Sequence, residues 1–408
     1  MPGAIHEAGE VDRWSEELRR PVPQLDAEAG FDVLDDFERF SQRNDVFCRS
    51  FWDPDVRTKR TEVFYETYRK PLKDFRNVDG FRQRDYSFRN AAWHVPDVFA
   101  ELKESEDRRE GFLDEYSVLR DGAGESVPVP SPVDMAAEIK RVAGAFGADL
   151  VGVTATDERW IYSHKYSAQT QGTKPNPVPT QAVNVIVVAT AMDYDLVKTV
   201  PSALSGAATG LGYSRDVATV LGLAQYIRNL GYRAVASLND TALAIPYALK
   251  AGLGEYGRHG LLITKEYGPR VRLGKVFTDL PLAHDRPIRF GVREFCETCR
   301  RCTDACPAKA ISGGAPSAET HNASNIRGIR KWTVDAEKCF GFWSGQNSDC
   351  SICIRVCPYN KDYTKWVFRL GRVLAGTFLR GLMLRLDIWL GYGRRMKAGW
   401  WWGGAEGN

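Results

Sequence analysis

The sequence predicts an α/β fold followed by a cysteine-rich segment, and two observations support this. Between residues 134 and 277, segments with apolar residues at helical spacing alternate with short apolar runs that are typical of buried strands. Eight of the nine cysteines then fall between Cys296 and Cys357. The alternation favours a layered α/β domain, and the clustered thiols indicate a metal-binding segment rather than a disulfide scaffold.

Residues 1–130 are predicted to form an irregular cap of short helices. They are polar, charged and rich in aromatic side chains that could anchor the cap to the core, and their periodicity is weak. The pair Arg19-Arg20 is followed by no apolar run, so neither a Sec nor a twin-arginine signal is predicted. As the sequence stands we expect a cytoplasmic protein, or an exported and membrane-associated one if a twin-arginine signal has been removed.

Residues 131–290 are predicted to form the core, with an insertion at about 155–182, after prolines at 128, 130 and 132 that mark a linker. We expect helices at 134–146, 213–230 and 241–250 and strands at 150–154, 183–190, 234–237, 261–264 and 271–277. No glycine-rich dinucleotide fingerprint follows a strand and no P-loop motif occurs. Nucleotide-binding α/β folds of those two kinds therefore lack support.

Residues 291–361 contain two cysteine motifs of the same design. The first has C-x-x-C-x-x-C-x-x-x-C-P spacing, and the second differs in having a long first gap. Bacterial ferredoxins that hold two 4Fe–4S clusters use this spacing, and the fourth cysteine of each run ligates the other cluster. A pair of structural zinc sites is the alternative, which the repeated full run disfavours. One cluster is thus assigned to Cys296, Cys299, Cys302 and Cys357, and the other to Cys306, Cys339, Cys350 and Cys353.

Residues 362–408 are predicted to form an amphipathic helix and a tail. Within 366–390, Arg369, Arg372, Arg380 and Asp387 fall on one narrow face, and the remaining surface is strongly apolar. We expect the wide apolar face to pack on the protein itself. Peripheral association with a membrane is the alternative, which the terminal run Trp400-Trp401-Trp402 favours.

The bulk composition excludes some classes of partner. The formal net charge is only +3 over 408 residues, and no basic stripe suggests nucleic-acid binding. No apolar run of ~20 residues predicts a transmembrane helix. The ninth cysteine, Cys48, has no assigned role.

Residues 133–361 resemble the catalytic subunit of corrinoid-dependent reductive dehalogenases. The most specific stretches are 239–242 (NDTA) and 257–264 (GRHGLLIT), followed by the two cysteine motifs. The resemblance implies a base-off cobamide in a nitroreductase-like core, reduced to Co(I) through the two clusters. It also implies an organohalide substrate and an external low-potential donor, such as ferredoxin, flavodoxin or a membrane donor, because no reductase module follows.

The same resemblance assigns site residues one by one. Tyr213, expected to open a helix, matches a proton donor to the dehalogenated carbon, Arg272 matches a basic residue beside it, and Asn239 matches a polar partner. Thr209 and Trp343 match positions that line the cofactor pocket. A guanidinium near a phenol makes its proton easier to give, which is consistent with this trio. Because Trp343 lies in the loop of the second cysteine set, we expect that cluster beside the corrin.

Each member of the trio also has a structural explanation. Tyr213 could be an interface residue, Arg272 could pair with Asp279, and Asn239 or Asp240 could cap a helix. Two other functions stay open: an epoxyqueuosine reductase-like enzyme acting on tRNA, and a non-catalytic iron–sulfur electron-transfer subunit. The first predicts a catalytic aspartate at the position of Tyr213, and the second predicts no corrinoid and no pocket near that residue.

Overall fold

The core of the protein is a four-stranded antiparallel sheet, seen in a computed structural model that describes residues 22–69, 76, 78–104, 124–167, 170–176 and 178–404. Its strands lie in the order β2 (Leu150–Ala155), β5 (Asn184–Ala191), β9 (Val271–Thr278) and β6 (Ala234–Ser237). The sequence predicts these four strands to within a residue or two. The pair Arg19-Arg20 lies outside the described residues.

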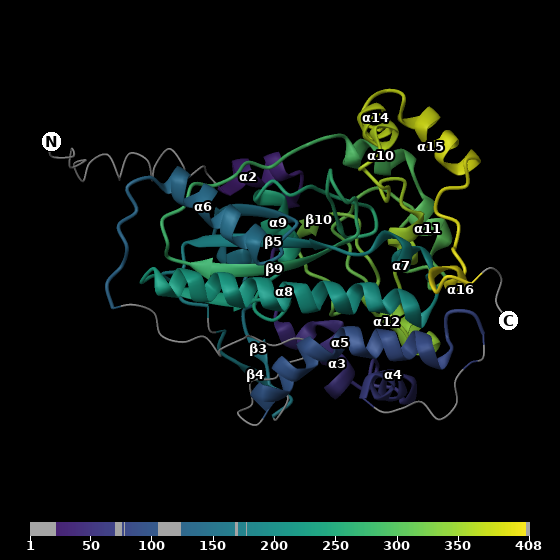
Figure 1. The fold of residues 1–408 in the computed structure, drawn as a ribbon, viewed down its shortest axis with the longest axis horizontal. Coiled ribbons are helices and arrows are strands. Elements are labelled where there is room, and N and C mark those ends of the chain that lie inside the picture. Colours follow the sequence, from purple (N-terminus) through teal and green to yellow (C-terminus); the bar gives the residue numbers. More distant parts are fainter. Residues whose placement is uncertain are drawn as a thin grey trace.

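Helices cover both faces of this sheet, which explains why its central strand β5 is an almost continuous apolar run. On one face, α6 (Pro132–Ala145) and α8 (Ala203–Asn229) pack on alternate strand residues that include Ile186 and Val188. On the other, α9 (Ala244–Lys250) packs on Val185 and Val187. The expected layered α/β core is therefore confirmed (Figure 1).

The longest helix, α8, begins ten residues before its predicted start. Ser202 caps it, with Oγ accepting a hydrogen bond from the Ser205 N–H at 3.0 Å. The run of Gly, Ala and Ser after the cap hides the helix from a periodicity argument. Two of its glycines face the cap helix α5 (Gln83–Glu104), where a Cβ on Gly206 would lie 2.8 Å from Arg89 Cδ and one on Gly210 would lie 2.9 Å from Trp93 Cδ1. These glycines let α5 approach α8 closely (Figure 1).

The cap consists of short helices together with the 22-residue α5. Its aromatic side chains anchor it, as expected: Phe47 and Phe64 contact Phe340 in edge-to-face arrangements, with ring centroids 5.2 Å and 5.8 Å apart. The other cap elements are α2 (Val22–Ala29), β1 (Asp32–Val33), η1 (Gln42–Asn44), α3 (Val46–Trp52) and α4 (Lys59–Arg69).

The insertion and the rest of the core contain short elements. These are η2 (Glu158–Trp160), β3 (Lys165–Tyr166), β4 (Thr173–Lys174), α7 (Tyr194–Lys198), β7 (Glu255–Tyr256) and β8 (Leu262–Ile263). The strand predicted at 261–264 is thus reduced to β8, which pairs with β7 outside the central sheet. The helix predicted at 241–250 begins only at Ala244.

The cysteine-rich segment folds as small helices joined by loops. They are α10 (Val292–Thr298), α11 (Arg301–Ala305), α12 (Ala336–Gln346) and α13 (Ile352–Val356), with the strand β10 (Ile329–Arg330) before α12. Strand β10 pairs with β1 of the cap, Asp32 opposite Arg330 and Val33 opposite Ile329. The cap is thereby fastened to this segment.

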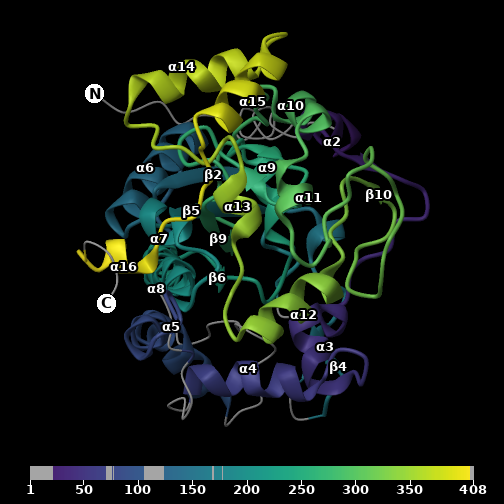
Figure 2. The same ribbon diagram turned by 90° about the vertical axis from the view of Figure 1, so that its right-hand side faces the viewer.

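The C-terminal region contradicts one expectation. The stretch 366–390 forms two helices, α14 (Trp366–Ala375) and α15 (Arg380–Trp389), and most of their large apolar side chains are exposed, while only a few, such as Met383 and Leu384, pack on the protein. The polar side packs inward because Asp387 is buried and pairs with Arg301 and with Lys361, whose Nζ lies 2.7 Å away. A last short helix, α16 (Ala398–Trp401), follows. Figure 2 shows α14 and α15 on the outer edge of the molecule, away from α16.

Candidate active site and metal centres

Tyr213, Asn239 and Arg272 come together from three elements. The Tyr213 hydroxyl accepts a hydrogen bond from Asn239 Nδ2 at 2.5 Å, and the Arg272 guanidinium carbon lies 5.5 Å from the Tyr213 ring centroid. Tyr213 lies ten residues inside α8 rather than at the start of a helix, so the prediction that it opens a helix is wrong. Its rigid position on a capped helix is better suited to holding a reacting group in place.

Arg272 is held in place by the sheet and by a glycine. It stands on β9 opposite Thr190 of β5, and its Nε donates to the Met192 sulfur at 3.4 Å. A Cβ on Gly212 would lie only 2.7 Å from Arg272 Cγ, so the glycine leaves room for this side chain to cross α8. The alternative ion pair is absent, since Asp279 instead accepts from the Arg233 N–H.

Asn239 does not cap a helix. Helix α9 begins five residues later, and the neighbouring Asp240 accepts a hydrogen bond from the Leu238 N–H at 2.7 Å. The loop that carries Asn239 is held by the Tyr162 hydroxyl, which donates to the Asn239 carbonyl at 3.2 Å. The Asn239 amide is therefore free of a capping role and is directed to Tyr213.

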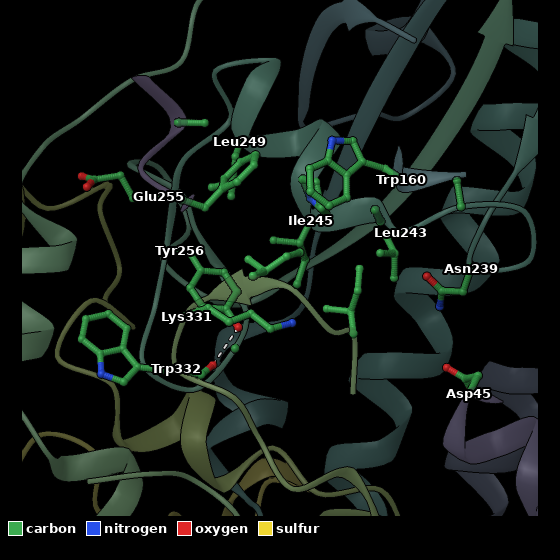
Figure 3. A pocket seen from close by; sticks show the side chains of 18 of the residues that line it. Asp45, Trp160, Asn239, Leu243, Ile245, Leu249, Glu255, Tyr256, Lys331 and Trp332 are labelled. Carbon is green, nitrogen blue, oxygen red and sulfur yellow. Dashed lines mark hydrogen bonds between the residues drawn. The ribbon is translucent and has the colours of Figure 1, made fainter. Parts of the chain in front are cut away.

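A cavity of about 370 Å³ contains all five predicted non-cysteine site residues in its wall. Its walls come from the cap, the core and the cysteine-rich segment. Figure 3 shows it as an elongated space with Asp45 and Asn239 at one end and Glu255, Tyr256 and Trp332 at the other. Between the two ends Figure 3 shows Leu243, Ile245 and Leu249, and Ile326 and Ile329 also line the cavity. Concave sites with an apolar body and a few convergent polar groups are typical of ligand pockets.

Several other residues of this wall were not predicted from the sequence. Burial raises the pKa of Asp45 to about 6, and burial lowers the pKa of Lys331 to about 8. The buried indole N–H of Trp160 has no hydrogen-bond partner among the described residues. Cys48 also lines the cavity, near Asp45, and burial raises its pKa well above the ordinary value. No motif marks these positions, because their proximity is created only by the folding of the cap over the core.

Two buried titratable residues, Asp216 and Lys275, lie near the trio. Asp216 lies one turn beyond Tyr213 on α8, and burial raises its pKa to about 7, although Thr190 donates a hydrogen bond to it. Burial lowers the pKa of Lys275 to about 8, opposed by the charges of Asp240 and Asp216, and its ammonium donates to the Leu238 carbonyl. Asp216 thus joins α8 to β5, and Lys275 joins β9 to the chain just after β6.

The eight clustered cysteines form two sets in space. Cys357 lies close enough to Cys296, Cys299 and Cys302 for their charges to act on its ionisation. In the same way Cys339 interacts with Cys350 and Cys306, and Cys353 interacts with these three and with Cys302. The grouping agrees with the crossover assignment, and the ligation itself stays a prediction. Among the described residues no three His, Cys, Asp or Glu side chains are arranged to hold a single metal ion.

Each set has a distinct environment. Beside the first set, the buried Arg258 donates to the carbonyls of Cys296 and Cys299 and to those of Ser312 and Gly314, at 2.7–3.1 Å. Beside the second set, the indole of Trp343 lies next to the Cys339 thiol and also lines the cavity. Trp343 therefore links the second set to the cavity.

Comparison with protein families and known proteins agrees with the description of the core and with that of the cysteine-rich segment. Residues 165–282 match the model of the reductive dehalogenase subunit, and residues 295–360 match that of the 4Fe-4S double cluster binding domain. The predicted double-cluster segment is therefore confirmed. The chain is 37% identical over 295 residues to the tetrachloroethene reductive dehalogenase of Sulfurospirillum multivorans, covering 65% of this chain and 58% of that one.

Two further relatives show how the similarity is distributed. A tetrachloroethene reductive dehalogenase of Desulfitobacterium hafniense is 38% identical over 296 residues, 62% of this chain and 53% of that one. An epoxyqueuosine reductase of Lactococcus garvieae is 38% identical over only 120 residues, 29% of this chain and 32% of that one. The chain thus spans somewhat more than half the length of these two dehalogenases.

Solved structures share the fold. One, described as a reductive dehalogenase structure that suggests a mechanism for B12-dependent dehalogenation, has a TM-score of 0.69 at 21% identity, covering 96% of this chain and 52% of that one. A catabolic reductive dehalogenase has a TM-score of 0.68 at 22% identity, covering 90% and 48%. These likenesses confirm the α/β core followed by a double-cluster domain.

Proposed function

We propose that this relative of the reductive dehalogenases removes halide from an organohalide by reduction. The carbon–halogen bond is replaced by a carbon–hydrogen bond, two electrons and one proton are consumed, and halide is released. The observation that carries the proposal is the trio Tyr213, Asn239 and Arg272 at one end of a cavity that also borders the cluster domain. A similarity of 37% identity over 295 residues to a tetrachloroethene reductive dehalogenase supports it.

The cavity fits a large cofactor of the corrinoid type. Its long apolar middle suits the face of a macrocycle, and the unpartnered indole N–H of Trp160 offers a donor to polar groups at the rim. Thr209 and Trp343 would line that ligand. A bound corrinoid would supply low-valent cobalt for cleavage of the carbon–halogen bond, chemistry that no side chain provides.

Tyr213 would give the proton to the carbon that loses its halogen. Its hydroxyl hydrogen is not engaged by Asn239, because Asn239 Nδ2 is the donor in their hydrogen bond. The same amide would stabilise a phenolate by donating to it, and the positive charge of Arg272 would act in the same direction. Asn239 and Arg272 thus favour loss of the tyrosine proton, while α8 keeps the hydroxyl fixed.

Electrons would enter through the two clusters from an external low-potential donor, which we propose to be a ferredoxin, a flavodoxin or a donor at a membrane. The second set, Cys306, Cys339, Cys350 and Cys353, would deliver them to the cavity, because Trp343 touches both. A role in tRNA modification is less favoured, since the similarity to epoxyqueuosine reductase covers less than half as many residues.

The test is anaerobic reconstitution with cobalamin, iron and sulfide, followed by halide release from a panel of organohalides with reduced methyl viologen. We expect corrinoid binding and halide release, and a fall of about 10²–10⁴-fold in turnover for Tyr213→Phe. Tyr162→Phe is the matched control, because Tyr162 lines the same cavity and bonds to the same residue, Asn239, but only through its carbonyl.

Three results would contradict the proposal. Failure to bind any corrinoid would leave an electron-transfer subunit. Corrinoid binding with release of no halide from any substrate, but turnover of epoxyqueuosine tRNA, would identify the second enzyme. Undiminished turnover of Tyr213→Phe would remove Tyr213 as the proton donor.

A further inference from the structure

An apolar surface is exposed at the C-terminal end of the described chain. Of 21 large apolar side chains that are exposed among the described residues, ten fall within 366–390. We name them the C-terminal apolar surface: Trp366, Val367, Leu370, Val373, Phe378, Leu382, Leu386, Ile388, Trp389 and Leu390. Phe378, Trp389 and Trp366 are 89%, 78% and 73% exposed, so these rings are almost fully in solvent. Contiguous apolar patches of this kind mark interaction sites.

The outward direction of this surface is fixed by the polar side of the same helices. On α15, Asp387 is buried between Arg301 and Lys361 of the cluster domain. On α14, Arg372 donates to the Lys265 carbonyl and stacks over Tyr363 at 5.0 Å. Turning the apolar residues inward would break these buried interactions. The apolar side chains are therefore exposed because the fold holds the helices in this orientation, and not because the end of the chain is loosely attached.

The positive charge of the segment that carries this surface favours an anionic partner. Residues 363–390 contain five Lys or Arg residues and one Asp, a formal charge of +4, whereas the whole chain carries +3. The remaining residues therefore carry −1. Arg385 and Lys365 are exposed next to the apolar side chains. Tryptophan, aliphatic side chains and surrounding cations are the combination that binds an anionic lipid surface.

We propose that the C-terminal apolar surface binds the headgroup region of an anionic phospholipid membrane, with α14 and α15 lying in its plane. Each helix has ten residues and is too short to cross a bilayer. None of the described helices combines the length and apolar character needed to span a membrane. Trp366 and Trp389 stand near opposite ends of this helix pair in the sequence, so both would anchor at the interface.

The position of this surface would also serve electron delivery, a step that rests on the proposed function. Met383 and Leu384 of α15 pack against the apolar group that includes Cys296, Cys299 and Cys357. A lipid surface covering the other side of α15 would therefore lie next to the first cysteine set. Electrons from a membrane donor would enter there and leave through the second set to the cavity.

The test is co-sedimentation of the cluster-reconstituted full chain with vesicles. We use phosphatidylcholine alone and phosphatidylcholine with about 30% phosphatidylglycerol. We expect binding to the anionic vesicles that weakens as salt rises. We expect Trp366→Gln/Trp389→Gln to lower the partition coefficient at least about tenfold, because two large apolar contacts are lost. Trp400→Gln is the matched control, since Trp400 is 58% exposed but lies on α16 away from the surface (Figure 2).

Several outcomes would overturn the proposal, and none of them depends on dehalogenase activity. These are no binding to anionic vesicles, equal binding by the double variant and the wild type, or a lipid-free dimer that the double variant dissociates. The last result would assign the surface to a second copy of the chain. If the double variant fails to fold, quenching of tryptophan fluorescence by brominated phospholipid in the unmodified protein decides, and absence of quenching refutes lipid contact.

Discussion

Gly212→Ala tests the arrangement of the trio without touching any of its members. The new Cβ would lie 2.7 Å from Arg272 Cγ and 3.5 Å from Arg272 Cβ, so Arg272 must move. Overpacking of this kind costs about 1–3 kcal/mol, while alanine in a helix interior gains about 1 kcal/mol over glycine. We therefore expect the free energy of unfolding to fall by about 0–2 kcal/mol.

The effect on turnover should be larger than the effect on stability. The Arg272 guanidinium carbon lies 5.5 Å from the Tyr213 ring centroid, close enough for its charge to assist transfer of a proton from the tyrosine. General acid catalysis contributes about 10²–10⁴-fold in rate, so a partial displacement of Arg272 should slow turnover about tenfold. Halide release at saturating substrate measures the rate, and thermal unfolding measures the stability.

Gly144→Ala provides the control for the substitution itself. Gly144 lies in α6, is exposed, and has nothing within 4 Å of the new Cβ, so only the helix-propensity gain remains. Turnover should be unchanged and the melting temperature slightly higher. If Gly212→Ala behaves like Gly144→Ala in both measurements, then Arg272 is not constrained by Gly212 and the reasoning fails.

Three further predictions concern the cavity wall, the surroundings of the first cysteine set and the C-terminal helices. Asp45→Asn keeps the cap of α3, where Asp45 accepts from the Phe47 N–H, and removes a carboxylate whose folded pKa of about 6 lies above its ordinary 3.8. A raised pKa destabilises the folded state as pH rises from about 4 to 6, so the variant should gain up to about 3 kcal/mol at pH 8 and about half of that at pH 5. An equal gain in melting temperature at both pH values would contradict this. Arg258→Gln removes a buried positive charge beside the first cysteine set and should lower the reduction potential of that cluster in an EPR-monitored titration. Arg258→Lys retains the charge and should lower the potential less. An unchanged potential in Arg258→Gln would refute the electrostatic role. Asp387→Asn leaves Arg301 and Lys361 without their shared buried carboxylate. We therefore expect proteolysis to cleave α15 before the core unfolds. If α15 and the core became sensitive to protease at the same denaturant concentration, Asp387 would not be what holds α15 in place.

The strands of the core could be predicted because burial on both faces leaves a continuous apolar run, as in β5. The start of α8 could not be predicted, because glycines and alanines such as Gly206 and Gly210 carry no periodic signal. Their role appears only when α5 is packed against them. The prediction for the C-terminal region was wrong for a different reason. Periodicity shows that a helix has an apolar and a polar face, but not which of them packs on the rest of the protein. Here the ion pairs of Asp387 with residues distant in the sequence hold the polar face inward.

The site shows the same division. Spacing alone identified both cysteine sets, because a ligand run of short gaps is local in sequence. Tyr213, Asn239 and Arg272 are separated by long stretches and were proposed only from a resemblance, although the structure brings them into one cavity wall. Asp45 and Lys331 were missed because each becomes a wall residue only through the approach of the cap and the cluster domain.

The pairing of β1 with β10 has a consequence for the lifetime of any bound ligand. The cavity wall includes Gly30 and Phe31 just before β1, and Ile329 and Arg330 of β10 itself. At the same point Gly328 adopts φ +70°, with room for no side chain against Phe37. Because ladder residues line the cavity, parting of this two-residue ladder would open the cavity on this side. We expect the opening of this small β-ladder, rather than any change at the trio, to influence how fast a bound ligand exchanges.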